Sequence, residues 1–206
     1  DAKWEHTYEK RAVSDGTFTT LSGQEQTVPM MHSLEERYLQ GQGAIGFRKN
    51  YAGGKYSFAA LLPDEGTDVR DYIQNLTPEE LSRILKQETI STVVATMPKF
   101  RCEASLTMND ILSEMGMPTA FDENAADFTK MGHSAWGRLY IGDVLHKTFI
   151  NVDELGTKAG AVTKVEVNAE GAILPEVSVT LDRPFVYMIL DNATNLPLFI
   201  GILTEV

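Results

Sequence analysis

The first candidates for chemistry in this sequence are a serine next to a histidine, and three further histidines. Gly132-His133-Ser134-Ala135-Trp136 approaches the G-x-S-x-G pattern, which places a serine nucleophile on a tight turn between a strand and a helix. Trp136 stands where that turn needs its second glycine, and the flanking residues do not predict a strand followed by a helix. Ser134 is therefore predicted to be an ordinary loop residue.

The sequence also lacks a residue pattern that would bind a metal or a cofactor. The four histidines, His6, His32, His133 and His146, show neither i, i+4 nor short-loop ligand spacing, and Cys102 is the only cysteine. His146 falls on one face of an apolar segment, so we interpret it as a hydrogen-bonded core residue rather than a general base. We expect no metal and no cofactor, and because no catalytic constellation remains, we expect a protein that is not an enzyme.

Composition limits the partners. The 206 residues include 18 basic and 29 acidic side chains, which gives a formal net charge of −11 and a pI near 4.8. Such a charge disfavours nucleic acid or an anionic membrane as the main partner. The hydrophobic fraction of 43% suffices for a core, and no apolar run approaches the ~18 residues that span a bilayer. Without repeats or a long linker, we predict one continuous domain over residues 1–206.

The elements that must position any site predict an α+β protein. Thr77-Pro78-Glu79-Glu80 is a helix-capping sequence, and apolar residues at 81, 84 and 85 continue the helical spacing. A second helix is expected from Met108 to Met115, ended by Gly116 and Pro118. Strands are expected at 18–31 around a Ser22-Gly23 turn, and at 44–47, 56–62, 93–99 and 140–152.

The C-terminal tail predicts a hairpin. Two apolar runs, 185–190 and 196–203, flank the turn-rich Asp191-Asn192-Ala193-Thr194-Asn195. Because both runs are almost continuously apolar, we expect both strands to be buried.

The segment from Gly156 to Leu174 is unusual, because loops of this length inside compact domains are uncommon. Its alternate residues form one uncharged face: Thr157, Ala159, Ala161, Thr163, Val165 and Val167. The charged residues Lys158, Lys164 and Glu166 fall on the other face, a distribution that chance alone also produces in about one case in four. The segment is a connector patterned to become a strand with one small, uncharged face.

Seven motifs in order give the chain a specific resemblance. They are Lys3-Trp4-Glu5, Val28-Pro29-Met30-Met31, Leu61-Leu62-Pro63-Asp64-Glu65-Gly66, Met97-Pro98-Lys99-Phe100, Leu112 to Phe121, His146 to Thr157, and Arg183-Pro184-Phe185 through Leu198-Phe199-Ile200-Gly201. In this order they resemble the serpin family of serine protease inhibitors, which trap proteases by inserting a reactive-centre loop into a β-sheet. The resemblance implies a serpin-like architecture with parts of sheets A, B and C, helices, and an exposed reactive-centre loop at about 156–175.

The resemblance also assigns roles to single residues. Glu154 corresponds to the hinge glutamate, and Lys99 to the lysine that pairs with it at the top of sheet A. Trp4 and His146 match residues in the region that opens for insertion. The hinge itself is implied at Glu154, Gly156, Thr157, Lys158, Ala159, Gly160, Ala161, Val162 and Thr163. Lys158 departs from the family's usual glutamate, on the outward face, where little effect is expected.

The resemblance implies a suicide-substrate inhibitor whose partner is a serine protease. Counting forward from Gly156 places the scissile bond at Glu170-Gly171, while counting back from Pro175-Glu176-Val177 places it at Gly171-Ala172. A bond after Glu170 suits a glutamate-specific protease, whereas one beside Ala169 or Ala172 suits an elastase-like or subtilisin-like enzyme. We favour the small-residue class.

A complete serpin is roughly twice as long, and this chain matches its C-terminal half. Sheet A would then lack strands, which another chain carrying the N-terminal half could supply. The alternatives are a non-inhibitory serpin, or a fragment that is cleaved as a simple substrate or self-associates by strand exchange. We expect an extracellular or cell-surface location, although the lack of disulfides fits secreted and intracellular serpins alike.

Overall fold

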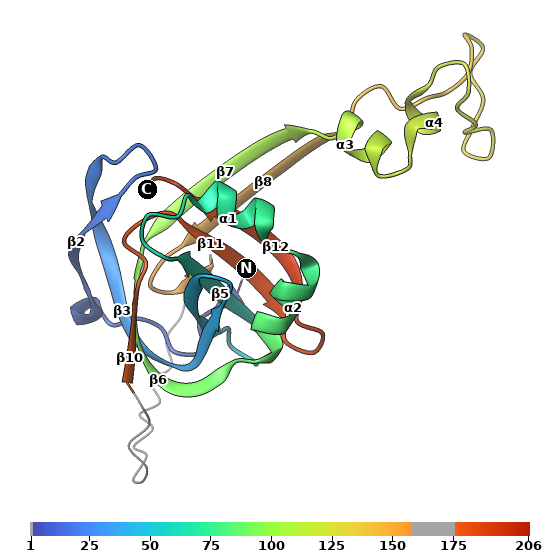
Figure 1. Ribbon diagram of the computed structural model, residues 1–206. Coiled ribbons are helices and arrows are strands. Elements are labelled where there is room, and N and C mark those ends of the chain that lie inside the picture. The colour runs from blue at the N-terminus through green and yellow to red at the C-terminus, as the bar shows by residue number, and fades with distance from the viewer. Residues whose placement is uncertain (1, 158–175) are drawn as a thin grey trace. The chain divides into compact units, whose positions relative to one another are not determined.

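The computed structural model describes residues 2–157 and 176–206 (Figure 1). These residues fold into strands with a few short helices, so the predicted α+β class is confirmed. The chain forms two compact units, one made of Asp1–Arg101 and Asn151–Val206 and the other of Cys102–Ile150.

The first unit is built on an eight-stranded sheet. Its strands are β2 (Val13–Thr19), β3 (Glu25–Gly41), β4 (Ala44–Asn50), β5 (Tyr56–Pro63), β6 (Thr89–Pro98), β10 (Glu176–Thr180), β11 (Phe185–Asp191) and β12 (Leu196–Leu203). The strand order is β10-β6-β3-β4-β5-β11-β12, and β2 also pairs with β3. Among the strand pairs that the described residues form in this sheet, only β10 and β6 run parallel.

The long strand β3 changes partners along its length. Its first part pairs with β2 and β6, and from Arg37 onward it also pairs with β4. An irregularity between Glu35 and Arg37 interrupts the register with β6. A bulge of this kind bends the strand locally, so the side chains near Glu35 are aimed differently from those of a regular ladder.

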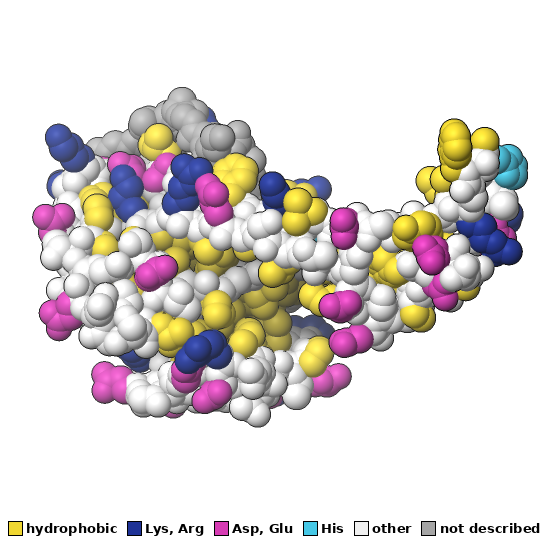
Figure 2. Space-filling view, turned by 90° about the horizontal axis from the view of Figure 1, so that it is seen from above, with side chains coloured by type: hydrophobic (Ala, Val, Ile, Leu, Met, Phe, Trp, Pro, Cys, Tyr) yellow, Lys and Arg dark blue, Asp and Glu magenta, His cyan; other side chains and the backbone are white. Residues whose placement is uncertain are grey.

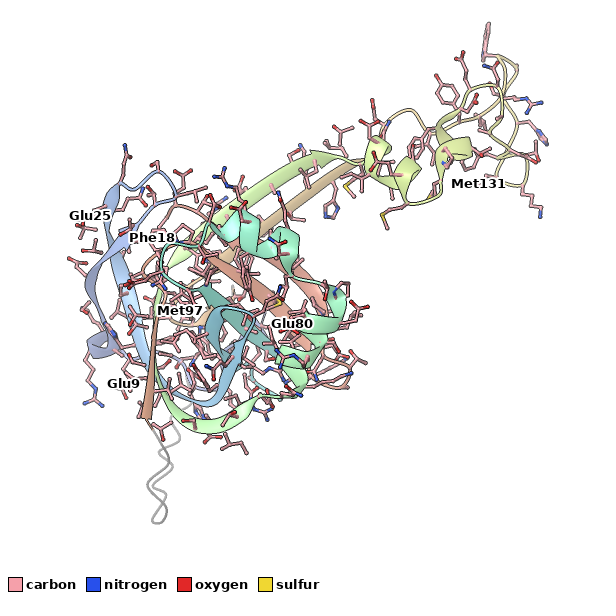
Figure 3. The ribbon with its side chains drawn as sticks, in the orientation of Figure 1. Glu9, Phe18, Glu25, Glu80, Met97 and Met131 are labelled. Atoms are coloured by element: carbon pink, nitrogen blue, oxygen red, sulfur yellow. The ribbon has the colours of Figure 1, made fainter. Side chains whose placement is uncertain are left out.

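The core follows from the apolar runs. Every residue of β5 after Tyr56 is buried, and β11 lies between β5 and β12. Helices α1 (Val69–Asn75) and α2 (Pro78–Lys86) pack their apolar side chains into the same cluster as Leu39, Leu61 and Met188. Elsewhere in this unit Phe18 and Met97 are fully buried (Figure 3). Burial of these side chains is the main stabilising contribution to the unit.

Helix α2 begins as the sequence predicts. Thr77 caps it, and its hydroxyl accepts a hydrogen bond from the Glu80 amide at 3.2 Å. Ile84 and Leu85 face the core. The Glu80 carboxylate pairs with Arg83. The cap leaves fewer amide groups of the first turn without a partner.

The C-terminal hairpin is confirmed, but the expectation that both strands are buried is wrong. Strand β11 is largely buried, whereas Leu196, Leu198 and Ile200 of β12 are each at least half exposed. β12 ends the strand order of the sheet, and these alternate residues share one face. A continuous apolar run therefore does not reveal whether the chain itself covers both faces.

The second unit contains most of a two-stranded sheet and two short helices. Strands β7 (Phe100–Thr107) and β8 (Leu145–Val152) pair with each other, and α3 (Asn109–Glu114) and α4 (Pro118–Phe121) follow β7. The predicted helix at 108–115 is confirmed, while the predicted strand at 140–152 begins only at Leu145. Hydrophobic side chains reach the surface of this unit (Figure 2), and Met131 and Trp136 are 83% and 97% exposed.

Three short elements complete the first unit: β1 (Ala2–Lys3), the 3-10 helix η1 (Lys10–Ala12) and β9 (Gly156–Thr157). β1 and β9 pair antiparallel, with Ala2 opposite Thr157 and Lys3 opposite Gly156. Residues 156–157, the start of the segment singled out in the sequence, therefore lie beside the N-terminal strand.

Candidate functional site

Trp4 directly follows β1 and lies in a buried aromatic cluster. Its ring stacks on Tyr51 with centroids 4.7 Å apart and planes 5° from parallel, and its edge meets Phe58. Trp4 is 2% exposed, and its indole N–H donates to the Asp153 carbonyl at 2.8 Å. A buried tryptophan needs a partner for this group, and here the partner belongs to the segment that leads into the long connector.

Backbone hydrogen bonds hold the residues after β8 against the N-terminal segment. The Trp4 amide donates to the Leu155 carbonyl at 3.1 Å, and the Tyr8 amide to the Glu154 carbonyl at 2.9 Å. The Tyr51 hydroxyl and Thr157 Oγ1 lie 2.8 Å apart. Burial raises the pKa of Tyr51 to about 12, so the hydroxyl keeps its proton even in mildly alkaline solution and can donate to Thr157.

Gly156 permits the close approach of the two short strands. Its φ is +145°, a conformation that side chains disfavour. A Cβ at this position would lie 2.3 Å from the Ala2 carbonyl oxygen and 2.7 Å from the Lys3 Cα. The pairing of β9 with β1 therefore requires glycine here.

Lys99 and Glu154 form an ion pair, with Lys99 Nζ 2.6 Å from Glu154 Oε2. The hydrogen bond from Lys99 is the main reason that the pKa of the Glu154 carboxyl lies below its usual value. Both side chains are about one third exposed, at 34% and 38%, so water screens the pair. The pair therefore adds little stability, and its role as a hinge contact stays a prediction.

A second cluster, centred on Lys49 next to Trp4, was not predicted from the sequence. Lys49 on β4 pairs with Glu35 on β3 at 2.7 Å, and their side chains are only 3% and 10% exposed. The Lys49 ammonium lies 4.6 Å from the centre of the Tyr8 ring and 5.5 Å from that of Trp4. Ser33 donates to Glu35 at 2.6 Å and also contacts the Tyr8 hydroxyl. The available signal was a lysine two positions after the apolar residues that predict a strand at 44–47.

The interpretation of His146 as a core residue is wrong. His146 is exposed near the start of β8, and burial on its face begins only further along the strand, with Ile150 and Val152. β8 has only β7 as a strand partner in the described chain. The prediction that His146 shares a face of the strand with Ile150 and Val152 was correct. The described residues do not cover that face at His146.

The remaining predicted loop residues lie outside the described part of the chain. These are Lys158, Ala159, Gly160, Ala161, Val162 and Thr163 of the hinge, and Glu170, Gly171 and Ala172 of the two candidate scissile bonds. Their assignments stay predictions.

Ser134 lies in a turn, where its hydroxyl accepts from the Trp136 amide at 3.0 Å. Together with His133 and Arg138 it lines an open depression between residues 126 and 139. Within the described residues no three His, Cys, Asp or Glu side chains are placed to hold a metal ion. The depression therefore offers polar groups without the hydrogen-bonded nucleophile and base of a hydrolase.

A serine and a histidine do meet elsewhere. Ser14 Oγ lies 3.0 Å from His32 Nε2, and Thr96 Oγ1 lies 3.1 Å from His32 Nδ1. The order resembles nucleophile, base and orienting group, but a neutral threonine cannot stabilise an imidazolium as a carboxylate does. The three side chains come from β2, β3 and β6, three adjacent strands. Their best-supported role is to cross-link these strands.

The chain belongs to the serpin family. The family model described as "Serpin (serine protease inhibitor)" matches residues 1–206. The solved native-state structure of the thermophilic serpin tengpin is similar to all of this chain, with a TM-score of 0.90 and 48% sequence identity, over 53% of the tengpin chain. The predicted serpin-like architecture is thus confirmed.

Curated relatives agree with this assignment. Serpin B10 of Rhinolophus ferrumequinum is 32% identical over 203 residues, which cover 96% of this chain and 50% of that protein. Leukocyte elastase inhibitor A of Mus musculus is 30% identical over 207 residues, covering 96% and 54%. The chain spans about half the length of the curated relatives it matches. Protease inhibition is therefore supported at the level of the family.

Two further predictions concern location and membranes. The names of these relatives do not support an extracellular location, which stays a prediction. None of the helices in the described ranges combines the length and apolar character needed to cross a bilayer.

Proposed function

We propose that this chain is the C-terminal half of a serpin that inhibits a serine protease as a suicide substrate. The observation that carries the proposal is the pairing of Gly156 and Thr157 with β1. It puts Thr157, the first residue of the uncharged face, in a strand position at the point where the long connector starts. Continued pairing in the same direction would extend this strand with small side chains on one face.

The chemistry is supplied by the protease. Its serine oxygen adds to the carbonyl carbon of Glu170, or of Gly171 in the second register, and the peptide C–N bond breaks. The new amine of the following residue takes a proton, and an ester joins the protease to the inhibitor. Insertion of the freed segment would carry the protease along before water hydrolyses the ester. The inhibitor contributes no catalytic residue.

The anchored start of the loop favours inhibition over simple cleavage. Insertion must be faster than deacylation, so the segment has to begin in register rather than search for its position. The Trp4, Tyr8 and Lys99 contacts hold Asp153–Thr157 in that position before any cleavage. The preferred target is a protease with a small primary pocket, elastase-like or subtilisin-like, with a glutamate-specific enzyme as the second candidate.

Denaturing electrophoresis tests the proposal. The chain, and any longer protein that contains it, is incubated briefly with elastase, subtilisin and a glutamate-specific protease. A band of the protease joined to the N-terminal cleavage product that survives boiling in SDS is the expected result, and mass spectrometry of the released piece fixes the bond. Protease whose serine is chemically blocked serves as the control. Cleavage without that band in every form tested would contradict trapping.

Two matched variants test the inward face. Thr157→Arg places a charge on the uncharged face, and we expect it to convert trapping into simple cleavage because an inserted charge would be buried. Lys158→Glu changes a charge on the opposite face and should trap as before. Equal trapping by both variants would contradict insertion.

Self-association is the competing outcome. The half-exposed residues of β12 leave an apolar face and a strand edge uncovered in the described chain. Oligomers that grow with concentration in size-exclusion chromatography, without any trapped protease, would favour a fragment that pairs by strand exchange.

A further inference from the structure

Lys49 is a buried cation held between an acid and two aromatic rings. The side chain of its partner Glu35 is 10% exposed, and the rings of Tyr8 and Trp4 lie within reach of cation–π attraction. Burial, and after it the negative charge of Glu35, raises the pKa of Tyr8 above its usual value, and the Tyr8 ring lies 4.6 Å from the ammonium.

An ion pair at this position has a large desolvation cost. Removing two charges from water costs about as much as their attraction returns, and apolar side chains of the same volume are often neutral or stabilising replacements. Stability alone therefore does not account for the ion pair that Lys49 makes at this buried position. An ammonium has preferred positions relative to a carboxylate and to ring faces, so the pair can act by orienting the neighbours of Lys49.

The rings that Lys49 touches also hold the start of the loop. Trp4 donates its indole N–H to Asp153 and its amide to Leu155, while the Tyr8 amide donates to Glu154. Trp4 in turn stacks on Tyr51, whose hydroxyl contacts Thr157. A continuous set of contacts thus runs from Glu35 through Lys49 and the rings to Thr157, all within the first unit.

We infer that Lys49 is a positioning residue for loop insertion: its ion pair with Glu35 sets the orientation of Trp4 and Tyr8, and these two residues hold Asp153–Thr157 in register. The inference rests on the proposed function, because it names the residue that prepares the hinge for insertion. Loss of Lys49 should loosen Trp4 and the hinge together, so that more protease completes hydrolysis.

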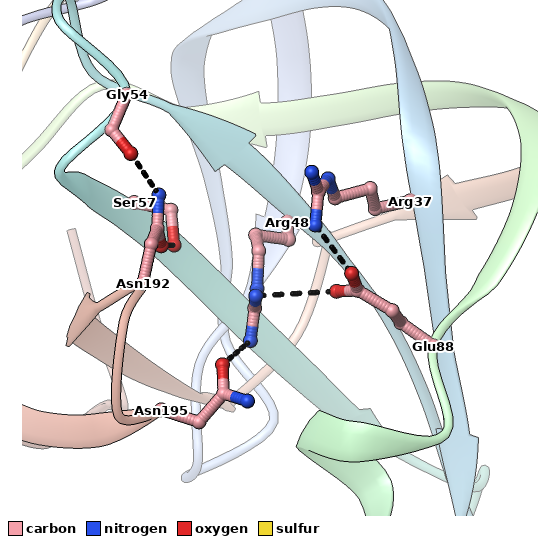
Figure 4. A network of polar contacts seen from close by, with 7 residues as sticks. All are labelled: Arg37, Arg48, Gly54, Ser57, Glu88, Asn192 and Asn195. Carbon is pink, nitrogen blue, oxygen red and sulfur yellow. Dashed lines mark hydrogen bonds and ion pairs between the residues drawn. The ribbon is translucent and has the colours of Figure 1, made fainter.

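Arg48 provides a matched control on the same strand. Its side chain is also 3% exposed, and as a neighbour in a strand it points to the opposite face. Its described partners are Glu88, with Arg48 Nη1 3.2 Å from Oε2, and Asn195, whose side-chain oxygen accepts at 2.8 Å (Figure 4). These contacts run towards the β11–β12 turn rather than towards Asp153–Thr157.

The experiment uses Trp4 as its own reporter. Trp136 is 97% exposed, so Trp136→Phe leaves Trp4 as the single tryptophan with little effect on folding. In this background we compare Lys49→Met, Arg48→Met, Lys49→Arg and the double variant Lys49→Met with Glu35→Gln, which removes both charges of the pair. The measurements are acrylamide quenching of Trp4 fluorescence, the urea midpoint, and the ratio of trapped to cleaved protease.

The positioning role predicts a specific pattern. Lys49→Met and the double variant should raise the quenching constant of Trp4 at least threefold and lower the trapped-to-cleaved ratio about tenfold. Arg48→Met should lower the urea midpoint without either change, and Lys49→Arg should restore most of the trapping because it keeps the cation. Should Lys49→Met fail to fold, the double variant carries the test.

Two results would overturn the inference: equal effects of Lys49→Met and Arg48→Met on quenching and trapping, or normal quenching in a folded double variant. Absence of trapping by the parent protein would overturn the proposed function instead. In that case the quenching pattern still decides whether Lys49 positions Trp4.

Discussion

The region around Trp4 and the segment Cys102–Ile150 show two ways in which this chain uses its residues. Around Trp4, side chains from the segment after β1 and from β3, β4 and β9 meet in one cluster, and Trp4 itself is 2% exposed. In Cys102–Ile150 only Ala126 and Ile150 are buried among the hydrophobic residues, and Trp136 is 97% exposed. The first region obtains its order from its own contacts, whereas the second has short helices and one strand pair to stabilise it.

Replacing each tryptophan with alanine gives the largest expected contrast. Trp4→Ala should lower the free energy of unfolding by about 3–5 kcal/mol, because it opens a cavity and leaves the Asp153 carbonyl without its indole partner. Trp136→Ala should change it by no more than about 0.5 kcal/mol, since the side chain lies in water. Urea unfolding followed by circular dichroism measures both. Similar losses would remove the contrast between the two regions.

Two glycines with positive φ sharpen the comparison. Gly156→Ala forces a Cβ into the backbone of Ala2 and Lys3, so we expect β9 to separate from β1 at a cost of about 2–3 kcal/mol. Gly137 has a φ of +135° but nothing within 4 Å of its Cβ position, so Gly137→Ala should cost only about 1 kcal/mol of backbone strain.

Hydrogen exchange at the Trp4 amide, which donates to Leu155, reports the separation of these strands. Faster exchange is expected in Gly156→Ala and unchanged exchange in Gly137→Ala. Equal exchange in the two variants would show that strain, rather than close approach, explains the glycine at 156.

Two asparagines test whether the loss of side-chain hydrogen bonds lowers the stability of a whole sheet or only of nearby residues. Asn192 accepts from Ser57 at 2.6 Å and donates to Gly54 at 2.9 Å, and Asn109 donates to Gly142 at 2.7 Å and accepts from Val144 at 2.9 Å. Replacing either with alanine should cost about 1–2 kcal/mol, since partly buried partners lose their hydrogen bonds. Asn192→Ala should lower the urea midpoint of the eight-stranded sheet, whereas Asn109→Ala should only speed hydrogen exchange at residues 109–144.

The Lys99–Glu154 pair gives the smallest effect. Because the pKa of Glu154 is lower in the folded protein, its contribution is complete above the unfolded value near 4.5 and is lost as the pH falls through the folded pKa. Solvent screening limits it to at most about 1 kcal/mol. Unfolding measured between pH 7 and pH 3 should show a shallower loss for Glu154→Gln than for the parent. Asp127→Asn, at an exposed carboxylate whose pKa is lowered by hydrogen bonds from Thr129, is the control from the other region.

Local pattern predicted some of the fold because its causes are local. The cap at Thr77, the turn at Ser22-Gly23 and the hairpin after Phe185 depend on nearby residues, and all three are present. The burial of β12 and His146 was predicted wrongly because it depends on what covers a face. Alternation along a strand shows which residues share a face and cannot show whether the chain supplies the layer above it.

The candidate site was only partly accessible from sequence. The resemblance brought Trp4, Lys99 and Glu154 to attention, and the structure places them around Asp153–Thr157. The Lys49–Glu35 pair escaped notice because its members are 14 positions apart on two neighbouring strands, and β3 has a register irregularity directly after Glu35 that the sequence does not reveal. The sequence of a strand does not show whether a charged side chain lies in water or pairs with a carboxylate inside the protein.

The position of β11 has a consequence for the protein after cleavage. β11 lies between β5 and β12, and its residues are mostly buried, while β10 is paired along five residues with β6. A cut anywhere in residues 158–175 would therefore produce two polypeptides that share one sheet. The cleaved protein would behave as a non-covalent heterodimer, keep its size in gel filtration, and separate into its two pieces only when the sheet unfolds.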